Sequence, residues 1–315
     1  MSKKIAFLFP GQGSQAVGMG RDLAERFPAA AATFAEADAA LGFPLSQLCF
    51  EGPEEALRLT ENTQPAIMAV SVAAARVLAE RGIVPALAAG HSLGEWSAHV
   101  IAGTLSFADA LRAVKARGAA MQKAVPAGEG AMAAILQLDA AQVAEACEEA
   151  ARETGLVVQA ANLNSPNQTV ISGAAAAVEK AAALSKAKGA RRTVMLPVSA
   201  PFHCALMQPA QEEVVRVLGG LTMHDPHIPV AANVTGSLVS TADAARDALI
   251  RQVTGAVRWV DCIRALKASG ANLFIETGPG KVLCGLLKQI DPELKSLNVE
   301  DAASLEKTLA ELKGA

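Results

Sequence analysis

The chain has 315 residues, of which 51% are hydrophobic, and it carries a formal net charge of -3 at pH 7. This length and apolar content predict a large buried core, in one large domain or two smaller ones. The slightly negative charge argues against a nucleic-acid binder and against a membrane-surface binder, because both classes favour a basic excess.

The cysteines and the N-terminus disfavour further classes of protein. The five cysteines are odd in number, widely spaced and without a C-x-x-C pair, so we expect reduced thiols rather than disulfides or a zinc site. The N-terminal apolar run is too short for a secretory signal peptide, and no apolar run approaches membrane-spanning length. We therefore expect a soluble cytoplasmic protein that binds no metal.

Apolar strand-like segments and helix-like segments alternate along the first part of the chain. A strand at 5–9 is followed by long helical stretches at 20–41 and 63–81, and then by an apolar run at 83–89 that leads to Ser92. This alternation predicts an α/β core with a parallel sheet.

The order of elements changes between two breaks, at 126–130 and 197–201. Here the pattern predicts strand, helix, strand, strand, helix and strand, which is the ferredoxin-like order. We therefore expect a small inserted ferredoxin-like subdomain at 127–199, within a hydrolase-like α/β subdomain made of 1–126 and 200–315. The second part of that larger subdomain has core-like strands at 229–234 and 273–276 and helices at 242–252, 259–268 and 304–312.

The pentapeptide Gly90-His91-Ser92-Leu93-Gly94 is the strongest indication of chemistry. Its G-x-S-x-G pattern stands between the apolar run and a helix-like stretch, an order that predicts a strand, a sharp turn and a helix with an exposed serine oxygen. The pentapeptide also arises by chance, so a structural turn serine is the alternative. In this setting Ser92 is predicted to be the nucleophile of a covalent acyl-transfer enzyme.

An acyl-transfer serine needs a general base, and the chain has five histidines. His203 stands in a loop where the chain re-enters the large subdomain, and a histidine pKa near neutrality suits both base and acid roles. A satisfied core histidine is the alternative for this residue. The other four are less suitable, because His91 is expected to point away from its neighbour, His99 lies two helical turns further on, and His224 and His227 belong to a solvated turn.

Two glycine-rich turns match nucleotide-binding motifs only in part. Gly11, Gly13 and Ala16 fit the dinucleotide pattern, but no helix opens at once and no second strand ends in an acidic residue about twenty residues later. Ile275 stands where a Walker A motif ending at Lys281 needs its first glycine. We expect the first turn instead to offer its backbone amides to an oxyanion.

Six motifs occur in order along the chain, and together they carry a family resemblance. They are FPGQGSQ at 9–15, TQPA at 63–66, GHSLGE at 90–95, RG at 117–118, PFHC at 201–204 and GPG at 278–280. This set closely resembles the malonyl-CoA:acyl carrier protein transacylases of fatty acid synthesis and the acyltransferase domains of polyketide synthases. The resemblance covers essentially the whole chain.

The resemblance implies catalytic roles for five residues. Ser92 would be the nucleophile and His203 its base. The backbone amides of Gln12 and Leu93 would form the oxyanion hole. The backbone carbonyl of Gln252 would orient the imidazole, in place of the carboxylate of a hydrolase triad, so the resemblance implies a dyad.

The resemblance also implies a set of substrate-binding residues. Arg117, from composition an ordinary helix-surface cation, would pair with the free carboxylate of a malonyl group. Gln12, His91 and Phe202 would contact the substrate as well. Phe202 stands where single-chain bacterial members often have serine, and its bulk would disfavour an α-methyl branch. Trp96 stands where tyrosine is frequent, and we draw no consequence from this difference.

The implied reaction is ping-pong transfer of a malonyl group from malonyl-CoA, through a malonyl-serine, to the phosphopantetheine thiol of holo acyl carrier protein. It needs no metal or organic cofactor. We expect a monomer that meets its acidic carrier through a local basic patch, although such charges are often only a solvated face. The candidates are Lys186, Lys188, Arg191, Arg192, Lys281 and Lys288.

Three alternatives remain open at this point. A trans-acting polyketide acyltransferase would have the same site, although the free-standing length favours fatty acid synthesis. A serine thioesterase or esterase shares the elbow but needs a third, acidic residue, for which the chain offers no clear context. A non-enzymatic carrier-binding scaffold would predict damage at Ser92, His203 or Arg117, and all three are present.

Overall fold

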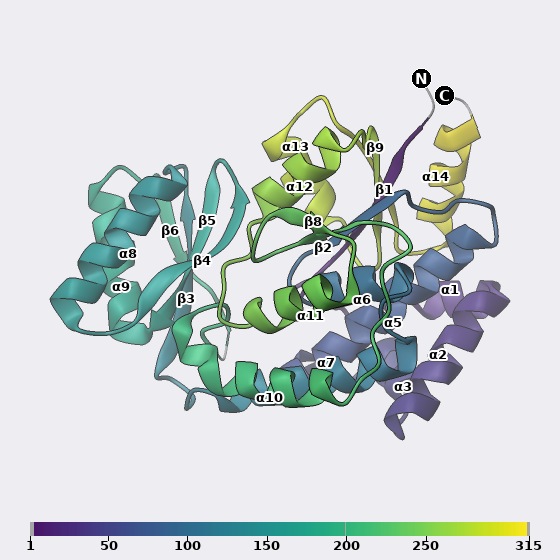
Figure 1. Ribbon diagram of the computed structural model, residues 1–315, viewed down its shortest axis with the longest axis horizontal. Helices are drawn as coiled ribbons and strands as arrows, with labels where there is room; N and C mark the ends of the chain where they lie inside the picture. Colours follow the sequence, from purple (N-terminus) through teal and green to yellow (C-terminus); the bar gives the residue numbers. More distant parts are fainter. Residues whose placement is uncertain (1–2, 199, 314–315) are drawn as a thin grey trace.

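The computed structural model describes residues 3–198 and 200–313, and its larger part is built on a six-stranded sheet (Figure 1). The strand order is β10-β9-β1-β2-β7-β8, and every pairing is parallel except that of β7 with β8. The predicted α/β core with a parallel sheet is therefore confirmed. The strands are β1 (Ile5–Phe9), β2 (Leu87–Gly90), β7 (Val230–Ala232), β8 (Ser237–Val239), β9 (Leu273–Thr277) and β10 (Lys295–Val299).

Strand β1 shows why the sequence of a central strand is an unbroken run of apolar residues. Successive side chains of a strand point to opposite faces, and both faces of this sheet are covered by helices. Phe7 and Phe9 enter the larger hydrophobic core, whereas Ala6 and Leu8 enter a second core on the other face of the sheet. The side chains of β1 are therefore apolar on both faces of the sheet.

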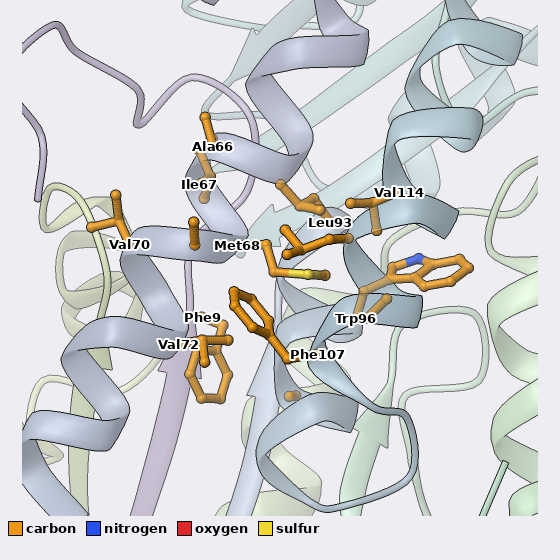
Figure 2. Close-up of a cluster of buried hydrophobic side chains, with 14 of the residues drawn as sticks. Phe9, Ala66, Ile67, Met68, Val70, Val72, Leu93, Trp96, Phe107 and Val114 are labelled. Atoms are coloured by element: carbon orange, nitrogen blue, oxygen red, sulfur yellow. The ribbon is translucent and has the colours of Figure 1, made fainter. Parts of the chain in front are cut away.

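The larger core lies around α5 (Thr60–Ala79), which packs on α2 (Pro28–Leu41), α6 (Leu93–Ile101) and α7 (Phe107–Lys123). Figure 2 shows Met68 of α5 among Leu93, Trp96 and Phe107. The second core is covered by α12 (Trp259–Ala268) and α13 (Val282–Ile290). The remaining helices of this part are α1 (Arg21–Arg26), α3 (Leu45–Glu51), α4 (Glu54–Arg58), the short 3-10 helix η1 (Ala205–Met207), α10 (Gln208–Gly219), α11 (Ala242–Arg251) and α14 (Ala302–Lys313).

The predicted helix at 20–41 was wrong in one respect, because the structure divides it into α1 and α2. Phe27 between them is extended, with φ -127° and ψ 117°, and Pro28 is the first residue of α2. Proline restricts the preceding residue to extended conformations and fits the first turn of a helix. The boundary therefore follows from Pro28 itself.

A separate antiparallel sheet, in the order β4-β5-β3-β6, forms the left part of the molecule in Figure 1. Two helices pack on it around their own hydrophobic core. The elements follow in the order strand, helix, strand, strand, helix, strand. They are β3 (Gly130–Leu136), α8 (Ala140–Thr154), β4 (Val158–Ser165), β5 (Gln168–Ala174), α9 (Ala175–Ala187) and β6 (Arg192–Met195).

Candidate functional site

Ser92 lies in a strained turn between the end of β2 and the start of α6. Its φ of 50° and ψ of -105° are unfavourable for a residue with a side chain. Two buried amide side chains hold the turn. The Ser92 N–H donates to Asn233 Oδ1 at 2.7 Å, and its carbonyl accepts from Gln252 Nε2 at 2.9 Å. The surroundings therefore fix the backbone that presents the serine hydroxyl.

The glycines of the pentapeptide allow β2, α6 and the loop after β1 to meet at backbone distance. A Cβ added to Gly90 would lie 1.8 Å from the carbonyl carbon of Gly94, and one added to Gly94 would lie 2.0 Å from Phe9 O. A Cβ on Gly11 would lie 2.5 Å from His91 O. Any side chain at these positions would push apart the backbone segments that build the turn.

His203 contacts Ser92 and is oriented by a backbone carbonyl. Its Nε2 lies 2.7 Å from Ser92 Oγ, and its Nδ1 lies 2.8 Å from Gln252 O. A carbonyl oxygen only accepts, so Nδ1 carries the proton, and the lone pair of Nε2 is left to accept the serine proton. Burial, reinforced by the charge of Arg117, lowers the pKa of His203 to about 3, so the imidazole is neutral at physiological pH.

Arg117 is fully buried beside this pair, unlike the surface cation that composition alone would indicate. Its Nη2 donates to Ser92 Oγ at 3.2 Å and to Gln252 Oε1 at 3.0 Å, while Nη1 donates to Gln64 Oε1 at 2.8 Å. Burial lowers the pKa of Arg117 to about 10, against the opposing effect of Glu95, and the guanidinium stays charged at neutral pH. Among the described residues, no carboxylate lies within ion-pair distance of it. The site thus offers a ligand a buried cation that has no acidic partner among the described residues.

The backbone amides of Gln12 and Leu93 are both available to a ligand. Gln12 follows β1 in the loop that touches His91, and Leu93 is the first residue of α6. Neither N–H donates to any acceptor among the residues that the structure describes. Both residues line the same cavity as Ser92. This is the environment that an oxyanion requires.

His91 and Phe202 also line this cavity. His91 does not contact Ser92 through its ring. Its Nε2 lies 2.8 Å from Asn164 Oδ1 on β4, and the ring is 5.6 Å from that of Trp259. Burial lowers the pKa of His91, so this ring too is neutral. Phe202 is 9% exposed and adds apolar bulk next to His203.

The cavity has a volume of about 640 Å³ and is lined by residues of both parts of the molecule, from the buried Arg117 to the exposed Arg58. Arg58 and Arg117 are the permanently charged residues among the described residues of its wall, which include no lysine, aspartate or glutamate. Its wall combines amide and thioether side chains with aliphatic ones. They include Gln12, Gln15, Gln64, Met121, Met132, Asn162, Leu196 and Val198.

Sequence reasoning missed three buried residues that hold the site. Asn233 Nδ2 donates to Gly90 O at 2.8 Å, and Glu95 Oε2 accepts from Asn233 N at 3.0 Å and from Gln252 Nε2 at 2.6 Å. Burial raises the pKa of Glu95 to about 7, against the hydrogen bonds and the charge of Arg117, which lower it. Gln64 is the third of these residues, and its Oε1 accepts from Arg117 Nη1. Glu95 follows the pentapeptide directly, so its position was a signal, whereas nothing near Asn233 in the sequence marks it.

The arrangement differs from the alternatives in observable ways. The partner of His203 Nδ1 is a carbonyl oxygen, where a serine hydrolase triad has a carboxylate. After the glycine turn that follows β1, the first helix begins only at Arg21, which does not match a dinucleotide fold. No group of three or more metal-ligating side chains, and no helix long and apolar enough to cross a membrane, occurs in the described residues.

Comparison with known proteins gives consistent results over the whole chain. The model of the family described as "Acyl transferase domain" matches residues 6–310. The malonyl CoA-acyl carrier protein transacylase of Bacillus subtilis strain 168 is 48% identical over 310 residues, covering 98% of both chains. That of Escherichia coli K12 is 49% identical over 303 residues, 96% of this chain and 97% of the relative.

Solved structures agree with this fold. The acyl carrier protein S-malonyltransferase of Vibrio cholerae is 49% identical and superposes with a TM-score of 0.94, over 97% of this chain and all of that one. The malonyl-transacylase PlMCAT, solved in complex with its holo type II PKS acyl-carrier protein AntF, is 47% identical with a TM-score of 0.94, over 98% of this chain and all of that one.

Proposed function

This chain belongs to the acyl transferase family, and we propose that Ser92 and His203 carry out its transfer of malonyl groups from malonyl-CoA to holo acyl carrier protein. The observation that carries the proposal is the position of Arg117, a buried cation that contacts Ser92 Oγ and has no acidic partner in ion-pair range within residues 3–198 and 200–313. An acyl group that bears its own carboxylate fits this arrangement, because the cation meets the anion next to the reacting carbonyl.

In the first half-reaction, His203 Nε2 takes the proton of the Ser92 hydroxyl as Oγ attacks the thioester carbonyl of malonyl-CoA. The negative charge that develops on the carbonyl oxygen is bound by the amides of Gln12 and Leu93. The C–S bond then breaks, and the imidazolium returns its proton to the departing CoA thiolate. A malonyl-serine ester remains.

The second half-reaction runs the same steps with a different thiol. The phosphopantetheine thiol of the carrier protein gives its proton to His203 and attacks the ester carbonyl. The Ser92 alkoxide leaves and takes the proton back from the imidazolium. Throughout, Gln252 O accepts the hydrogen bond that His203 Nδ1–H donates, and this keeps Nε2 facing the serine. The malonyl group keeps both carboxyl carbons, since no step breaks a carbon–carbon bond.

Within this proposal Arg117 selects the acyl group. Its planar fork pairs with the malonyl carboxylate, and Gln64 and Gln252 hold the guanidinium in place. A hydrogen bond to a charged group contributes about 1.5 to 3 kcal/mol, on the order of tenfold to a hundredfold in discrimination against acetyl. His91 and Phe202 close the remaining space around the acyl group.

We place the enzyme in fatty acid synthesis, as a cytoplasmic monomer without cofactor, with 127–199 as its inserted small subdomain. The trans-acting polyketide role is the second candidate, because the carrier in the complex with PlMCAT is a type II PKS protein.

The residues expected to form the basic patch differ in their contacts. Lys188 is paired with Glu145 and Glu149, and Lys186 Nζ donates to Arg191 O. Arg192, Lys281 and Lys288 are exposed and form no ion pair among the described residues, so they fit a carrier contact better.

Intact-protein mass spectrometry after brief incubation with malonyl-CoA tests the proposal. We expect a single malonyl adduct on the wild type, none on Ser92→Ala, and discharge of the adduct when holo carrier protein is added. Discharge to water at the same rate without carrier would instead support a hydrolase. The absence of any adduct from malonyl-CoA, acetyl-CoA or methylmalonyl-CoA would exclude Ser92 as the nucleophile.

A further inference from the structure

The charge on the wall of the cavity is concentrated at two positions. Arg117 is buried at the inner end beside Ser92, and Arg58 belongs to the same wall with its side chain 68% exposed. No acidic residue is among the described residues of the wall. The cavity therefore suits a ligand with one negative charge at its buried end and another at its solvent end.

Arg58 is joined to the inner site through a short stretch of chain. It is the last residue of α4, Leu59 is extended, and α5 begins at Thr60. Gln64, in the second turn of α5, holds Arg117 at 2.8 Å. The position of Arg58 is thus fixed relative to the buried arginine by a helix that is itself part of the core.

The side chain of Arg58 is free to take a new partner. Its Nη2 lies 2.6 Å from Glu54 Oε1, one turn earlier on α4, and the Glu54 side chain is 62% exposed. Ion pairs of this kind in water contribute very little to stability. A phosphate group, which accepts two hydrogen bonds from the guanidinium fork, can therefore replace or join the carboxylate at small cost.

We propose that Arg58 binds the phosphate of the phosphopantetheine arm at the mouth of the cavity. This inference rests on the proposed function, because both substrates then carry the same arm, with sulfur at one end and phosphate at the other. The acyl carboxylate meets Arg117, the thioester lies at Ser92, and the neutral amides of the arm follow the amide-lined wall at Gln12 and Asn162.

The test compares donors that differ only in phosphate: malonyl-CoA, malonyl-phosphopantetheine and malonyl-pantetheine. We expect Arg58→Ala to lower the rate constant of Ser92 acylation at low donor concentration about fivefold for the first two. For malonyl-pantetheine the variant should equal the wild type. Raising the salt concentration should reduce the fivefold effect, because the contact is exposed to solvent.

Arg26→Ala is the matched control. Arg26 also ends a short helix, is 63% exposed and pairs with an acid one turn earlier, Asp22, but it does not line the cavity. It should leave all three donors unchanged. In the second half-reaction, Arg58→Ala should slow discharge of the malonyl-enzyme onto holo carrier protein by a similar factor, while discharge onto free pantetheine stays the same.

Three results would overturn the inference. An equal loss with malonyl-pantetheine would show that Arg58 acts on the fold of the site, which a thermal melt would reveal independently. A loss with malonyl-CoA alone would assign Arg58 to the nucleotide part of CoA. No loss with any donor would leave Arg58 without a binding role. Failure of the proposed function is a different observation, since the wild type itself would then form no malonyl adduct.

Discussion

Ser92 and His203, whose side chains meet at 2.7 Å, both have a backbone conformation that residues with a side chain rarely adopt. Their φ angles are 50° and 60°. Only Gln137 shares this property among the described residues other than glycine. Conformations of this kind cost on the order of 1 to 3 kcal/mol each, so the fold holds both residues of the proposed catalytic pair under strain.

Replacing Ser92 by glycine should therefore give a protein that is more stable than Ser92→Ala, while both changes abolish acylation. Glycine relieves the strain at φ 50° and ψ -105°, although it also gains entropy in the unfolded chain. We expect Ser92→Gly to be about 1 kcal/mol more stable than Ser92→Ala, which removes the hydroxyl but keeps the Cβ. Urea unfolding of the two inactive variants measures the difference, and equal stabilities would show that the turn is not strained.

Arg117→Ala should lose malonyl transfer by tenfold to a hundredfold and retain or gain acetyl transfer, since the only contact with the acyl group that it removes is the one to the malonyl carboxylate. Acylation rates with malonyl-CoA and acetyl-CoA measure the ratio. Arg117→Lys keeps the charge but not the fork, and it should recover only part of the malonyl rate. An equal fall of both acyl groups in Arg117→Ala would contradict a role in selection.

Phe202→Ser should widen the acyl preference. Phe202 lines the cavity beside His203, and its removal leaves room for an α-methyl branch. One methyl group in an apolar pocket changes discrimination by on the order of tenfold to two hundredfold. Competition between methylmalonyl-CoA and malonyl-CoA, read from the masses of the two adducts, gives the ratio directly. An unchanged ratio would remove Phe202 from the acyl pocket.

Two glycine-to-alanine changes should act in opposite directions. Gly94→Ala places a methyl group 2.0 Å from Phe9 O, a backbone atom that cannot move alone, and we expect a loss of about 3 kcal/mol or more. Gly285→Ala, in α13, meets nothing within 4 Å and should gain up to about 1 kcal/mol from helix propensity. Denaturant unfolding checks both, and a tolerated Gly94→Ala would mean that β1 and α6 are less tightly joined.

His99 should make stability fall in acid. It is fully buried on α6, its Nδ1 lies 3.2 Å from Thr104 Oγ1, and its Nε2 has no partner among the described residues. Burial lowers its pKa from 6.5 to about 4. Between these values the unfolded chain binds the proton more readily than the folded one, so the contribution of His99 to stability is lost as the pH falls.

Comparison of wild type with His99→Gln isolates this contribution, because His91 and His203 are present in both. Between pH 7.5 and pH 5 the wild type should lose about 2 kcal/mol more free energy of unfolding than the variant. Urea titrations at the two pH values measure it. Parallel losses in the two proteins would indicate that the buried imidazole becomes protonated without unfolding.

The predictable parts of this molecule are those with a local cause. Five apolar residues in succession predicted β1. The break between α1 and α2 also has a local cause in Pro28, but this cause was missed and one helix was expected over 20–41. Ser92 was found because its pattern stands between a strand and a helix. β10, which pairs only at the edge of the sheet, has no such apolar run, and no strand was predicted there.

The unpredictable parts depend on residues that meet only in the folded chain. A charged residue within a helix is usually exposed, so the burial of Arg117 was implied by the resemblance and not by its neighbours in the sequence. Asn233 acts on Ser92 from 141 positions away. The sequence around Arg58 indicates only a basic residue at the end of a helix, and its position on the cavity wall is known only from the folded chain.

The carbonyl that orients His203 has a consequence for the charge of the reacting site. An imidazolium formed beside Arg117 is a second cation, and Gln252 O offers it only a dipole. On the proposed mechanism, a malonyl group brings the missing anion with it, since its carboxylate already pairs with Arg117 when His203 takes up the proton. The proposal therefore makes the acyl group the source of the counter-charge that a hydrolase keeps in its own sequence, and it implies that acetyl, which has none, is disfavoured in the chemical step as well as in binding.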